Sequence, residues 1–416
     1  MAQTQIGSLT ARDATQWPGP AQLRAPPLGL PARAPSRDPS PVLEPSPDDL
    51  SREVYCVLGL PIDAIELGEA LRRIRAAAKS GTPFFLSTPN LNFLINSLAD
   101  PEFRESLLLS DLCPADGMPI VWIARLAGIP IKQRVAGSDI FESLKEAKSL
   151  AQRLTVFLLG GQHDVAASAC VALNAGPGAV RCVGSMNPGY GDVEDLSSDA
   201  IIDAINASNA DFLNVALGAA KGQAWLVRNH RRLRVPVRAH LGAVINFQAG
   251  SVERAPALLR KAGLEWLWRI KEEPHLWTRY WRDGCVLLRL LLTRVLPLVI
   301  HSSWHTPGRH RRNLRMETCE HRGSVVVKLA GVATSHHAAA AIAEFRHALP
   351  LARERVIVDV SGIRAIDARF LGLLLMVRKH LNKRRARLEF VGASRAIKRT
   401  FRLNGLGFLL STEQAA

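Results

Sequence analysis

The chain has 416 residues, of which 47% are hydrophobic, 22% charged and 6% aromatic, and its formal net charge is +16 at pH 7. This apolar content is enough for folded cores, so the composition excludes a chain that is disordered throughout. No run of 18 apolar residues offers a membrane-spanning helix, and the polar N-terminus lacks the pattern of a secretory signal. Six scattered cysteines without a Cys-x-x-Cys pair argue against a zinc site or a disulfide framework, and they favour a cytoplasmic protein.

Residues 1–50 are predicted to form a disordered tail, because they hold 10 of the 25 prolines and little that could form a core. Order is expected to begin near Glu53, with the apolar run Val54–Leu58.

Residues 53–262 are predicted to form an α/β domain with a Rossmann-like, mostly parallel sheet. Short apolar runs alternate here with helical periodicity, which is typical of a parallel sheet covered by helices on both faces. Ligands of such sheets bind beyond the carboxyl ends of the strands, where helix N-termini attract anions. The expected strands are Pro83–Ser87, Thr155–Leu159, Asp211–Leu217 and Val237–Val244.

Residues 263–315 are predicted to be a basic, aromatic appendage and linker. Five of the eight tryptophans lie between Trp266 and Trp304, and the stretch Ser251–Arg315 has 13 Lys/Arg against 5 Asp/Glu. The apolar stretch Cys285–Ile300 is too short to span a bilayer and contains two arginines and a proline. It suits a helix lying in an anionic membrane interface; the alternative is a buried helix with snorkelling arginines.

Residues 322–412 are predicted to form a second, smaller α/β domain. Its expected strands are Ser324–Leu329, Val356–Val360 and Arg387–Val391, and its expected helices are Ser335–Ala348, Ala368–Leu381 and Ser394–Leu403.

A set of ordered landmarks makes residues 53 to about 283 resemble the WecG/TagA/CpsF family of bacterial glycosyltransferases. The landmarks are Thr88-Pro89-Asn90, Ala115-Asp116-Gly117-Met118, Arg134 to Asp139, Gly160-Gly161, Pro188-Gly189-Tyr190, Gly218 to Trp225, Gly250, Arg254-Ala255-Pro256, Gly263 to Arg269 and Glu273-Pro274.

The resemblance implies transfer of a sugar from a UDP-sugar to a polyprenyl-diphosphate-linked acceptor, with inversion and with neither a metal nor another cofactor. The chain has no Asp-x-Asp pair of the kind that holds a divalent ion on a diphosphate, so arginines and helix N-termini would have to stabilise the leaving group. The resemblance makes Asp116 the general base, a role that requires burial to raise its pKa. The alternative is that Asp116 caps the helix expected to begin at Met118.

The resemblance also implies a set of substrate-binding residues near this base. In this family the active-site Gln belongs to a Gly-x-Pro-Lys-Gln-Glu motif, whereas this chain has Gly218-Ala219-Ala220-Lys221-Gly222-Gln223. Gln223 either replaces the missing amide one residue later or marks a changed pocket. The implied substrate-binding residues are Thr88, Asn90, Arg134, Ser138, Asp139, Lys221, Gln223, Arg269, Arg279 and Arg282.

The C-terminal domain resembles a STAS domain through Val356–Ile363 and Ala365–Gly372. Phosphorylated members have a hydroxyl residue after the motif Asp, whereas here Ala368 follows Asp367, so the resemblance implies an unphosphorylatable docking module for a protein partner. Deletion of residues 322–416 is accordingly expected to spare transfer.

Two functions remain open. The first is a surface-glycan transferase on the cytoplasmic face of the membrane, and the second is a catalytically degenerate transferase fold that acts as a regulator through its STAS domain. Nucleic-acid binding is not expected, because no recognisable module accompanies the positive charge.

Overall fold

The computed structural model describes residues 48–147, 153–162, 164–261, 263–304, 313–321, 324–352 and 354–414. Nearly all of the tail expected at residues 1–50, and residues 305–312 of the expected linker, therefore lie outside the described residues. The described chain opens with the short helix η1 (Asp49–Ser51).

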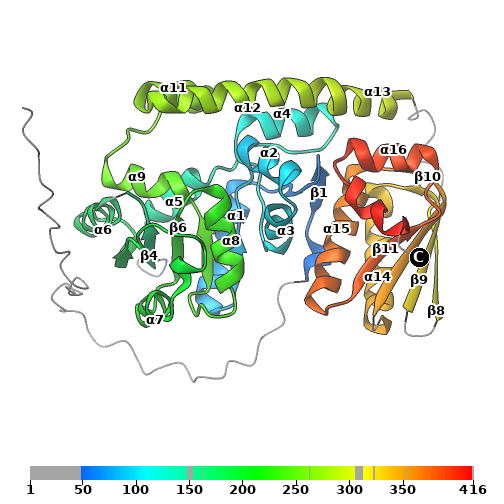
Figure 1. Cartoon of the computed structure of the whole chain (residues 1–416), viewed down its shortest axis with the longest axis horizontal. Coiled ribbons are helices and arrows are strands. Elements are labelled where there is room, and N and C mark those ends of the chain that lie inside the picture. Colours follow the sequence, from blue (N-terminus) through cyan, green and yellow to red (C-terminus); the bar gives the residue numbers. More distant parts are fainter. Residues whose placement is uncertain are drawn as a thin grey trace, which may run out of the picture. The chain divides into compact units, whose positions relative to one another are not determined.

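A five-stranded, fully parallel sheet forms the centre of the larger N-terminal part (Figure 1). The strand order is β3-β7-β6-β4-β5, so strands that follow one another in the chain are not always neighbours in the sheet. The strands are β3 (Phe84–Leu86), β4 (Leu154–Gly160), β5 (Val180–Met186), β6 (Phe212–Ala216) and β7 (Val237–His240).

Helices cover both faces of this sheet. Successive side chains of each strand point to opposite faces, and the apolar ones on both faces need packing partners. In β4, Val156 and Leu158 pack into one core cluster with α1, α5, α6 and α9, whereas Phe157 and Leu159 pack into another with α7 and α8. The helices are α1 (Leu67–Ser80), α2 (Leu91–Ala99), α3 (Pro101–Leu109), α4 (Met118–Leu126), α5 (Gly137–Lys145), α6 (Val165–Ala175), α7 (Asp199–Ala207), α8 (Ala219–Asn229), α9 (Gly242–Ala249) and α10 (Ala257–Lys261).

Two strands differ from the sequence-based expectation. The strand expected at Val237–Val244 ends at His240, because Leu241 donates its N–H to the side chain of Asn214 and helix α9 then begins at Gly242. The apolar run in the sequence continues beyond the end of the strand, because Val244 and Ile245 of α9 are buried as well. Strand β5 was not anticipated; it is an edge strand whose residues alternate between buried and more exposed positions, so it lacks a continuous apolar run.

A β-hairpin precedes the five-stranded sheet. Strands β1 (Val54–Val57) and β2 (Leu60–Asp63) pair antiparallel around a two-residue turn, Leu58-Gly59, in which both residues have positive φ. This is the backbone geometry of the tight hairpin turns that match strand twist. Every residue of both strands is buried.

The smaller C-terminal part is a four-stranded sheet in the order β11-β10-β9-β8. Its strands are β8 (Arg315–His321), β9 (Ser324–Ala333), β10 (Arg355–Ile366) and β11 (Arg387–Val391), and all pair in parallel except β8 with β9. Strand β8 begins before residue 322, where the domain was expected to start. The helical elements are η7 (Ser335–His337), α14 (Ala338–Leu351), α15 (Ala368–Lys383), α16 (Arg395–Leu403) and η8 (Gly407–Gln414).

The C-terminal part shares a hydrophobic core with the N-terminal hairpin. Leu50, Val54 and Cys56 belong to the same buried cluster as Phe370 and other residues of α15. The backbones approach closely: a Cβ added at Gly372 would lie 2.1 Å from the carbonyl oxygen of Val54. Only glycine permits this contact.

A buried charge network crosses the same contact. The Lys379 side chain of α15 is fully buried, and its Nζ donates to Asp49 Oδ1 at 2.7 Å, to Asp111 Oδ1 at 2.9 Å and to the Ser110 carbonyl at 2.9 Å. Arg52 also binds Asp49, at 3.1 Å. Every acceptor of Lys379 belongs to the N-terminal part, so the C-terminal domain is joined to it by ionic as well as apolar contacts.

The expected apolar helix at residues 285–300 lies within a longer helical segment. It comprises α11 (Glu265–Glu272), η4 (Pro274–Leu276), α12 (Trp277–Leu290), the π-helical turn η5 (Leu291–Val295) and α13 (Leu296–Trp304). Proline lacks the N–H that a regular helix needs, and Pro297 is the second residue after the π turn. No helix among the described residues is long and apolar enough to cross a membrane.

Candidate active site

The turn between β3 and α2 contributes Thr88 and Asn90 to the sheet's carboxyl edge. Asn90 is the N-cap of α2, and its Oδ1 accepts the backbone N–H of Phe93 at 3.1 Å. Thr88 is buried beside the start of α5: a Cβ built on Gly137 would lie 3.2 Å from Thr88 Oγ1. The structure thus brings both residues to the same edge, with the Asn90 side chain engaged as a helix cap.

Asp116 lies next to this turn. Its backbone N–H donates to the Pro89 carbonyl at 2.9 Å, and its Oδ2 accepts the N–H of Gly137 at 3.5 Å. Gly117, with a φ of 91°, is the N-cap of α4, and no side chain caps that helix. The alternative in which Asp116 caps this helix is therefore wrong.

The surroundings of Asp116 give it the protonation behaviour of a base. Burial raises its pKa from 3.8 to about 7; the positive charge of Arg134 opposes this rise, and the negative charge of Glu265 adds to it. A carboxyl with a pKa near the working pH is ionised in a large fraction of molecules and still basic enough to accept a proton.

An ion-pair network borders Asp116. Arg134 binds Glu265 of α11 at 2.6 Å and Asp139 of α5 at 3.0 Å. Asp139 also accepts hydrogen bonds from Arg254 and, at 3.4 Å, from Arg260, and Arg254 reaches Ser138 Oγ at 3.3 Å. The structure therefore unites Arg134, Ser138 and Asp139, which the sequence placed together.

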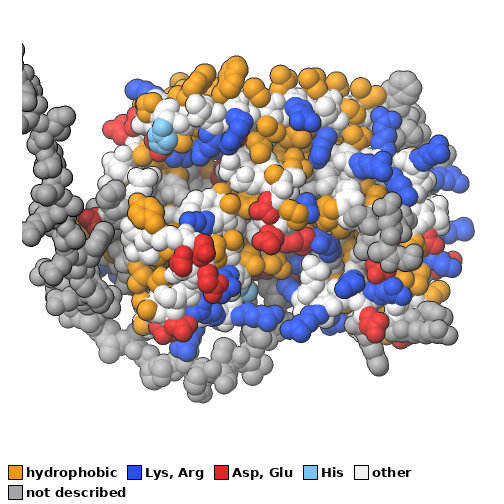
Figure 2. All heavy atoms as spheres, in the orientation of Figure 1, with side chains coloured by type: hydrophobic (Ala, Val, Ile, Leu, Met, Phe, Trp, Pro, Cys, Tyr) orange, Lys and Arg blue, Asp and Glu red, His pale blue; other side chains and the backbone are white. Residues whose placement is uncertain are grey.

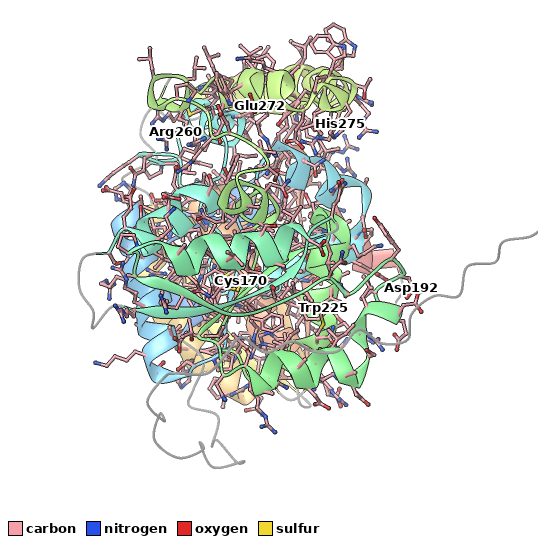
Figure 3. All side chains as sticks on the ribbon, turned by 90° about the vertical axis from the view of Figure 1, so that its left-hand side faces the viewer. Cys170, Asp192, Trp225, Arg260, Glu272 and His275 are labelled. Carbon is pink, nitrogen blue, oxygen red and sulfur yellow. The ribbon has the colours of Figure 1, made fainter. Side chains whose placement is uncertain are left out.

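Two arginines of this network were missed as site residues by sequence reasoning. The Nε atoms of Arg254 and Arg260 are buried, and among the described residues they have no hydrogen-bond partner. The motif Arg254-Ala255-Pro256 was the available signal, but nothing in the sequence showed that it returns to Asp139. In Figure 3, Arg260 and Glu272, the last residue of α11, are labelled in the upper part of the view, whereas Trp225 of α8 lies well below them.

The two predicted substrate-binding residues of α8, Lys221 and Gln223, differ from each other in their surroundings. Lys221 is exposed, and its Nζ donates to the Gly191 carbonyl at 2.6 Å. Gln223 has no exposed surface and exchanges hydrogen bonds with Ser87, its Nε2 lying 2.9 Å from Ser87 Oγ. Gln223 therefore supports the strand end beneath Thr88, and its amide is not presented to a ligand.

The three arginines expected from the appendage are also separated. Arg269 binds Glu273 at 2.8 Å and lies 5.8 Å from the ring centroid of Phe247 in α9. Arg279 is half-buried over Tyr280, whereas Arg282 is largely exposed. Of the three, Arg269 lies over a residue of α9.

A histidine that the sequence did not single out ends β7. His240 is 7% exposed, and neither ring nitrogen has a hydrogen-bond partner within the described part of the chain. Burial lowers its pKa to about 4, so the ring is neutral at physiological pH. Two cavities in the described part of the chain, of about 580 and 260 Å³, are lined by other residues. The first has Glu194, Ser197, Ser198, Asp199, Arg228 and Arg232 in its lining, and the second has Leu98, Arg104, Arg294, Arg402, Gly405, Gly407 and Phe408.

Comparison with known proteins assigns this arrangement to a family. The model described as "Glycosyl transferase WecG/TagA/CpsF family" matches residues 55–298, more than half of the chain. The chain belongs to the WecG/TagA/CpsF family of glycosyl transferases. A family relative from Bacillus spizizenii (strain ATCC 23059 / NRRL B-14472 / W23), named N-acetylglucosaminyldiphosphoundecaprenol N-acetyl-beta-D-mannosaminyltransferase, is 26% identical over 195 residues, covering 47% of this chain and 74% of the relative.

The C-terminal part of this WecG/TagA/CpsF chain matches the model "Mlab, STAS domain" over residues 316–411. A similar solved structure, titled "Structure of the Bacillus Cell Fate Determinant SpoIIAA in the Phosphorylated Form", is 21% identical with a TM-score of 0.21 and covers 25% of this chain and 100% of that chain.

The STAS motif Asp is engaged in the fold. Asp367 is the N-cap of α15, accepting the N–H of Phe370 at 2.8 Å and that of Ser335 at 2.7 Å. The adjoining Ala368 packs against a core cluster that includes Tyr55 and Val57 of the hairpin. Position 368 thus lies against the transferase part of the chain.

Proposed function

We propose that the protein transfers N-acetylmannosamine from a UDP-sugar to a polyprenyl-diphosphate-linked acceptor, with inversion and without a metal ion. The observation that carries the proposal is the pKa of Asp116, raised by burial to about 7 at the edge of the sheet where ligands of this fold class bind. The name of the Bacillus spizizenii relative supports the sugar and the acceptor class.

The proposed chemistry is a single displacement. The acceptor hydroxyl oxygen attacks the anomeric carbon from the face opposite the diphosphate, the bond between that carbon and the diphosphate oxygen breaks, and UDP leaves with the bonding electron pair. The Asp116 carboxylate takes the hydroxyl proton as the new bond forms. One base suffices because inversion requires only one displacement.

The leaving diphosphate gains negative charge, which the network around Asp139 is suited to stabilise. Arg254 and Arg260 retain buried Nε–H donors that find no acceptor among the described residues, and guanidinium groups bind phosphate oxygens in a fixed geometry. The N-terminal turn of α8 begins at the end of β6 and adds unpaired backbone N–H groups.

The acceptor is proposed to be reached at an anionic membrane on its cytoplasmic face. Large apolar side chains are exposed along α11 to α13, and Figure 2 shows hydrophobic side chains in a row along that edge, with Lys and Arg side chains beside them. Such an amphipathic surface suits reversible binding in the membrane interface. The exposed residues are Trp266, Leu267, Trp277, Trp281, Leu288, Leu292, Leu296 and Ile300.

The testing experiment is a transfer assay with the purified full-length chain. UDP-N-acetylmannosamine and an N-acetylglucosaminyl diphosphate lipid analogue are expected to yield a disaccharide lipid and UDP in equal amounts. A chain that binds UDP-sugar but forms no product with this pair would contradict the proposal and favour the regulatory alternative.

Metal independence is tested in the same assay. We expect EDTA to leave most of the activity, because arginines can provide the charge stabilisation that a divalent ion provides in other transferases. Complete loss of activity that manganese or magnesium restores would show that a metal is required.

A further inference from the structure

His240 is a buried polar side chain at the sheet edge that the proposed mechanism leaves unused. It is the last residue of β7, and its ring centroid lies 6.2 Å from that of Phe93, in the first turn of α2. The next residue, Leu241, contacts the site from the other side: a Cβ at Gly137 would lie 2.5 Å from Leu241 Cδ2 and 3.2 Å from Thr88 Oγ1. Gly137 is also the residue whose N–H binds Asp116.

Gly222 makes room for the imidazole. A Cβ at Gly222, in the first turns of α8, would lie 2.2 Å from His240 Cδ2, whereas one at Gly242 would make an ordinary contact, 3.5 Å from Cε1 and Nε2. Gly222 does not have a positive φ, so its backbone conformation does not require glycine. A glycine inside a helix also lowers the stability of that helix relative to alanine. The space that the His240 ring occupies explains why residue 222 is glycine. A larger side chain at position 222 would overlap with the His240 ring in its present position.

The ring has hydrogen-bonding capacity that the described residues do not satisfy. A neutral imidazole has one N–H donor and one acceptor nitrogen, and buried polar groups without partners are rare in folded proteins. The two nitrogens point away from each other, so two separate ligand groups, one that accepts a hydrogen bond and one that donates, would satisfy both. Sugar hydroxyls and acetamido groups have this combination, whereas a diphosphate offers only acceptors.

We propose that His240 is a substrate-binding residue that hydrogen-bonds a hydroxyl or acetamido group of a reacting sugar from the position where Gly222 leaves space. This inference rests on the proposed function and extends it to recognition of the sugar. Position 222 is where the family motif has Gln, so an imidazole from β7 takes the volume that an amide from α8 would occupy, and Gln223, bonded to Ser87, does not fill this role.

The test compares substitutions at His240 with one at His230, a histidine bonded through Nδ1 to Arg238 at 3.0 Å near the opposite end of α8. His240→Ala is expected to raise the KM for one sugar substrate at least about tenfold with a smaller change in kcat. His240→Asn, which keeps a donor and an acceptor, is expected to recover part of that loss. His230→Asn should leave KM within about twofold of wild type.

A volume swap gives the sharper comparison. Gly222→Gln alone is expected to clash with His240 and lose more activity than His240→Gly alone, whereas the double variant His240→Gly/Gly222→Gln should exceed the Gly222→Gln variant in kcat/KM. The double variant and His240→Asn also provide the comparison if His240→Ala melts below the assay temperature. A rise in KM for the UDP-sugar assigns His240 to the donor, and a rise for the lipid-linked substrate assigns it to the acceptor.

Binding measurements separate this inference from the proposed function. Calorimetric titration of wild type and His240→Ala with UDP-N-acetylmannosamine and with UDP requires no turnover. Weaker binding of the UDP-sugar with unchanged binding of UDP would support a donor contact even in a chain that transfers nothing. Unchanged KM for both substrates together with unchanged binding of the UDP-sugar in folded His240→Ala would overturn the inference.

Discussion

At the scale of single residues, Asp116 and Asp49 show how neighbouring charges shift the pKa values of two desolvated carboxyls in opposite directions. Burial raises the pKa of Asp116 to about 7, and a single nearby arginine shared with two other carboxylates opposes it. Burial would also raise the pKa of Asp49, but Lys379, Arg52 and Lys383 lower it to about 2. Asp49 has three cations beside it and Asp116 has one, which accounts for the difference, and of the two carboxyls only Asp116 can accept a proton near neutral pH.

The pKa of Asp116 predicts the pH dependence of transfer. We expect kcat/KM to fall about tenfold per pH unit below about pH 7 and to level off above it, because the ionised carboxylate is the reactive form. Asp116→Asn should reduce transfer at least about 100-fold and remove this dependence. Full activity in the variant would exclude Asp116 as the base.

Two controls accompany that variant. Asp203→Asn, an exposed change on α7, should have wild-type kinetics. The folded-state pKa of Asp116 lies above its unfolded value, so this group's contribution to stability is lost as pH rises from about 4 to 7. The Asn variant should therefore melt no lower than wild type at pH 8, which separates a catalytic defect from unfolding.

At the scale of elements, helix α15 of the STAS domain contacts strand β1 of the transferase part. Gly372 allows the backbones to meet, and Lys379 neutralises the Asp49 and Asp111 carboxylates beneath them. Lys379 donates hydrogen bonds to Ser110 and Asp111, which lie shortly before Asp116 in the sequence.

Lys379→Met should lower the free energy of unfolding by about 3 kcal/mol, because it leaves buried carboxylates with one cation fewer. Lys328→Met, an exposed lysine on β9, is the matched control and should change stability little. Denaturant unfolding of both variants is the measurement. Equal stabilities would show that the buried network contributes nothing.

The helical segment α11 to α13 has two faces that the sequence did not separate. The apolar residues Leu291 and Val295 pack toward the core, and Val295 is only 2% exposed, so glutamates at these positions would disrupt folding. The residues that face outward lie one position further along the helix, at Leu292 and Leu296.

Leu288, Leu292 and Leu296 replaced together by Glu should lower binding to anionic liposomes at least about tenfold, because the change removes apolar insertion and adds negative charge. Val171→Glu, an exposed apolar residue on α6, is the control. Liposome flotation and hydrolysis of soluble UDP-sugar are measured for both. Wild-type flotation of the triple variant would exclude this face as the membrane contact.

At the scale of the whole molecule, the STAS domain shares a hydrophobic core with residues of the transferase part. Leu50, Val54, Cys56 and Leu108 belong to the hydrophobic core formed chiefly by STAS residues. We therefore expect, in contrast to the sequence-based prediction, that deletion of the C-terminal domain impairs transfer.

Deletion of residues 316–416 should yield an aggregating or strongly destabilised protein, because it exposes these apolar side chains and removes the cation from Asp49 and Asp111. Size-exclusion chromatography and thermal melting are the measurements. A monomeric truncated protein with the wild-type melting temperature and full transfer would contradict this prediction.

Sequence alone was sufficient for features with local physical causes. Alternating apolar runs predicted the order of four of the five parallel strands along the chain, and ordered motifs indicated both the WecG/TagA/CpsF family and the STAS domain. Strand β11 has the expected bounds Arg387–Val391 because its pattern is short, alternating and bounded by polar turns.

Other features depend on residues that are distant along the chain. The convergence of Arg254 and Arg260 on Asp139, the burial of Gln223 against Ser87 and the fit of His240 over Gly222 each join separate elements. The same holds for Lys379, whose acceptors lie more than 250 residues earlier. No local pattern encodes such contacts, because the spacing between two strands or helices, and hence which side chain fills it, exists only once the whole core has packed.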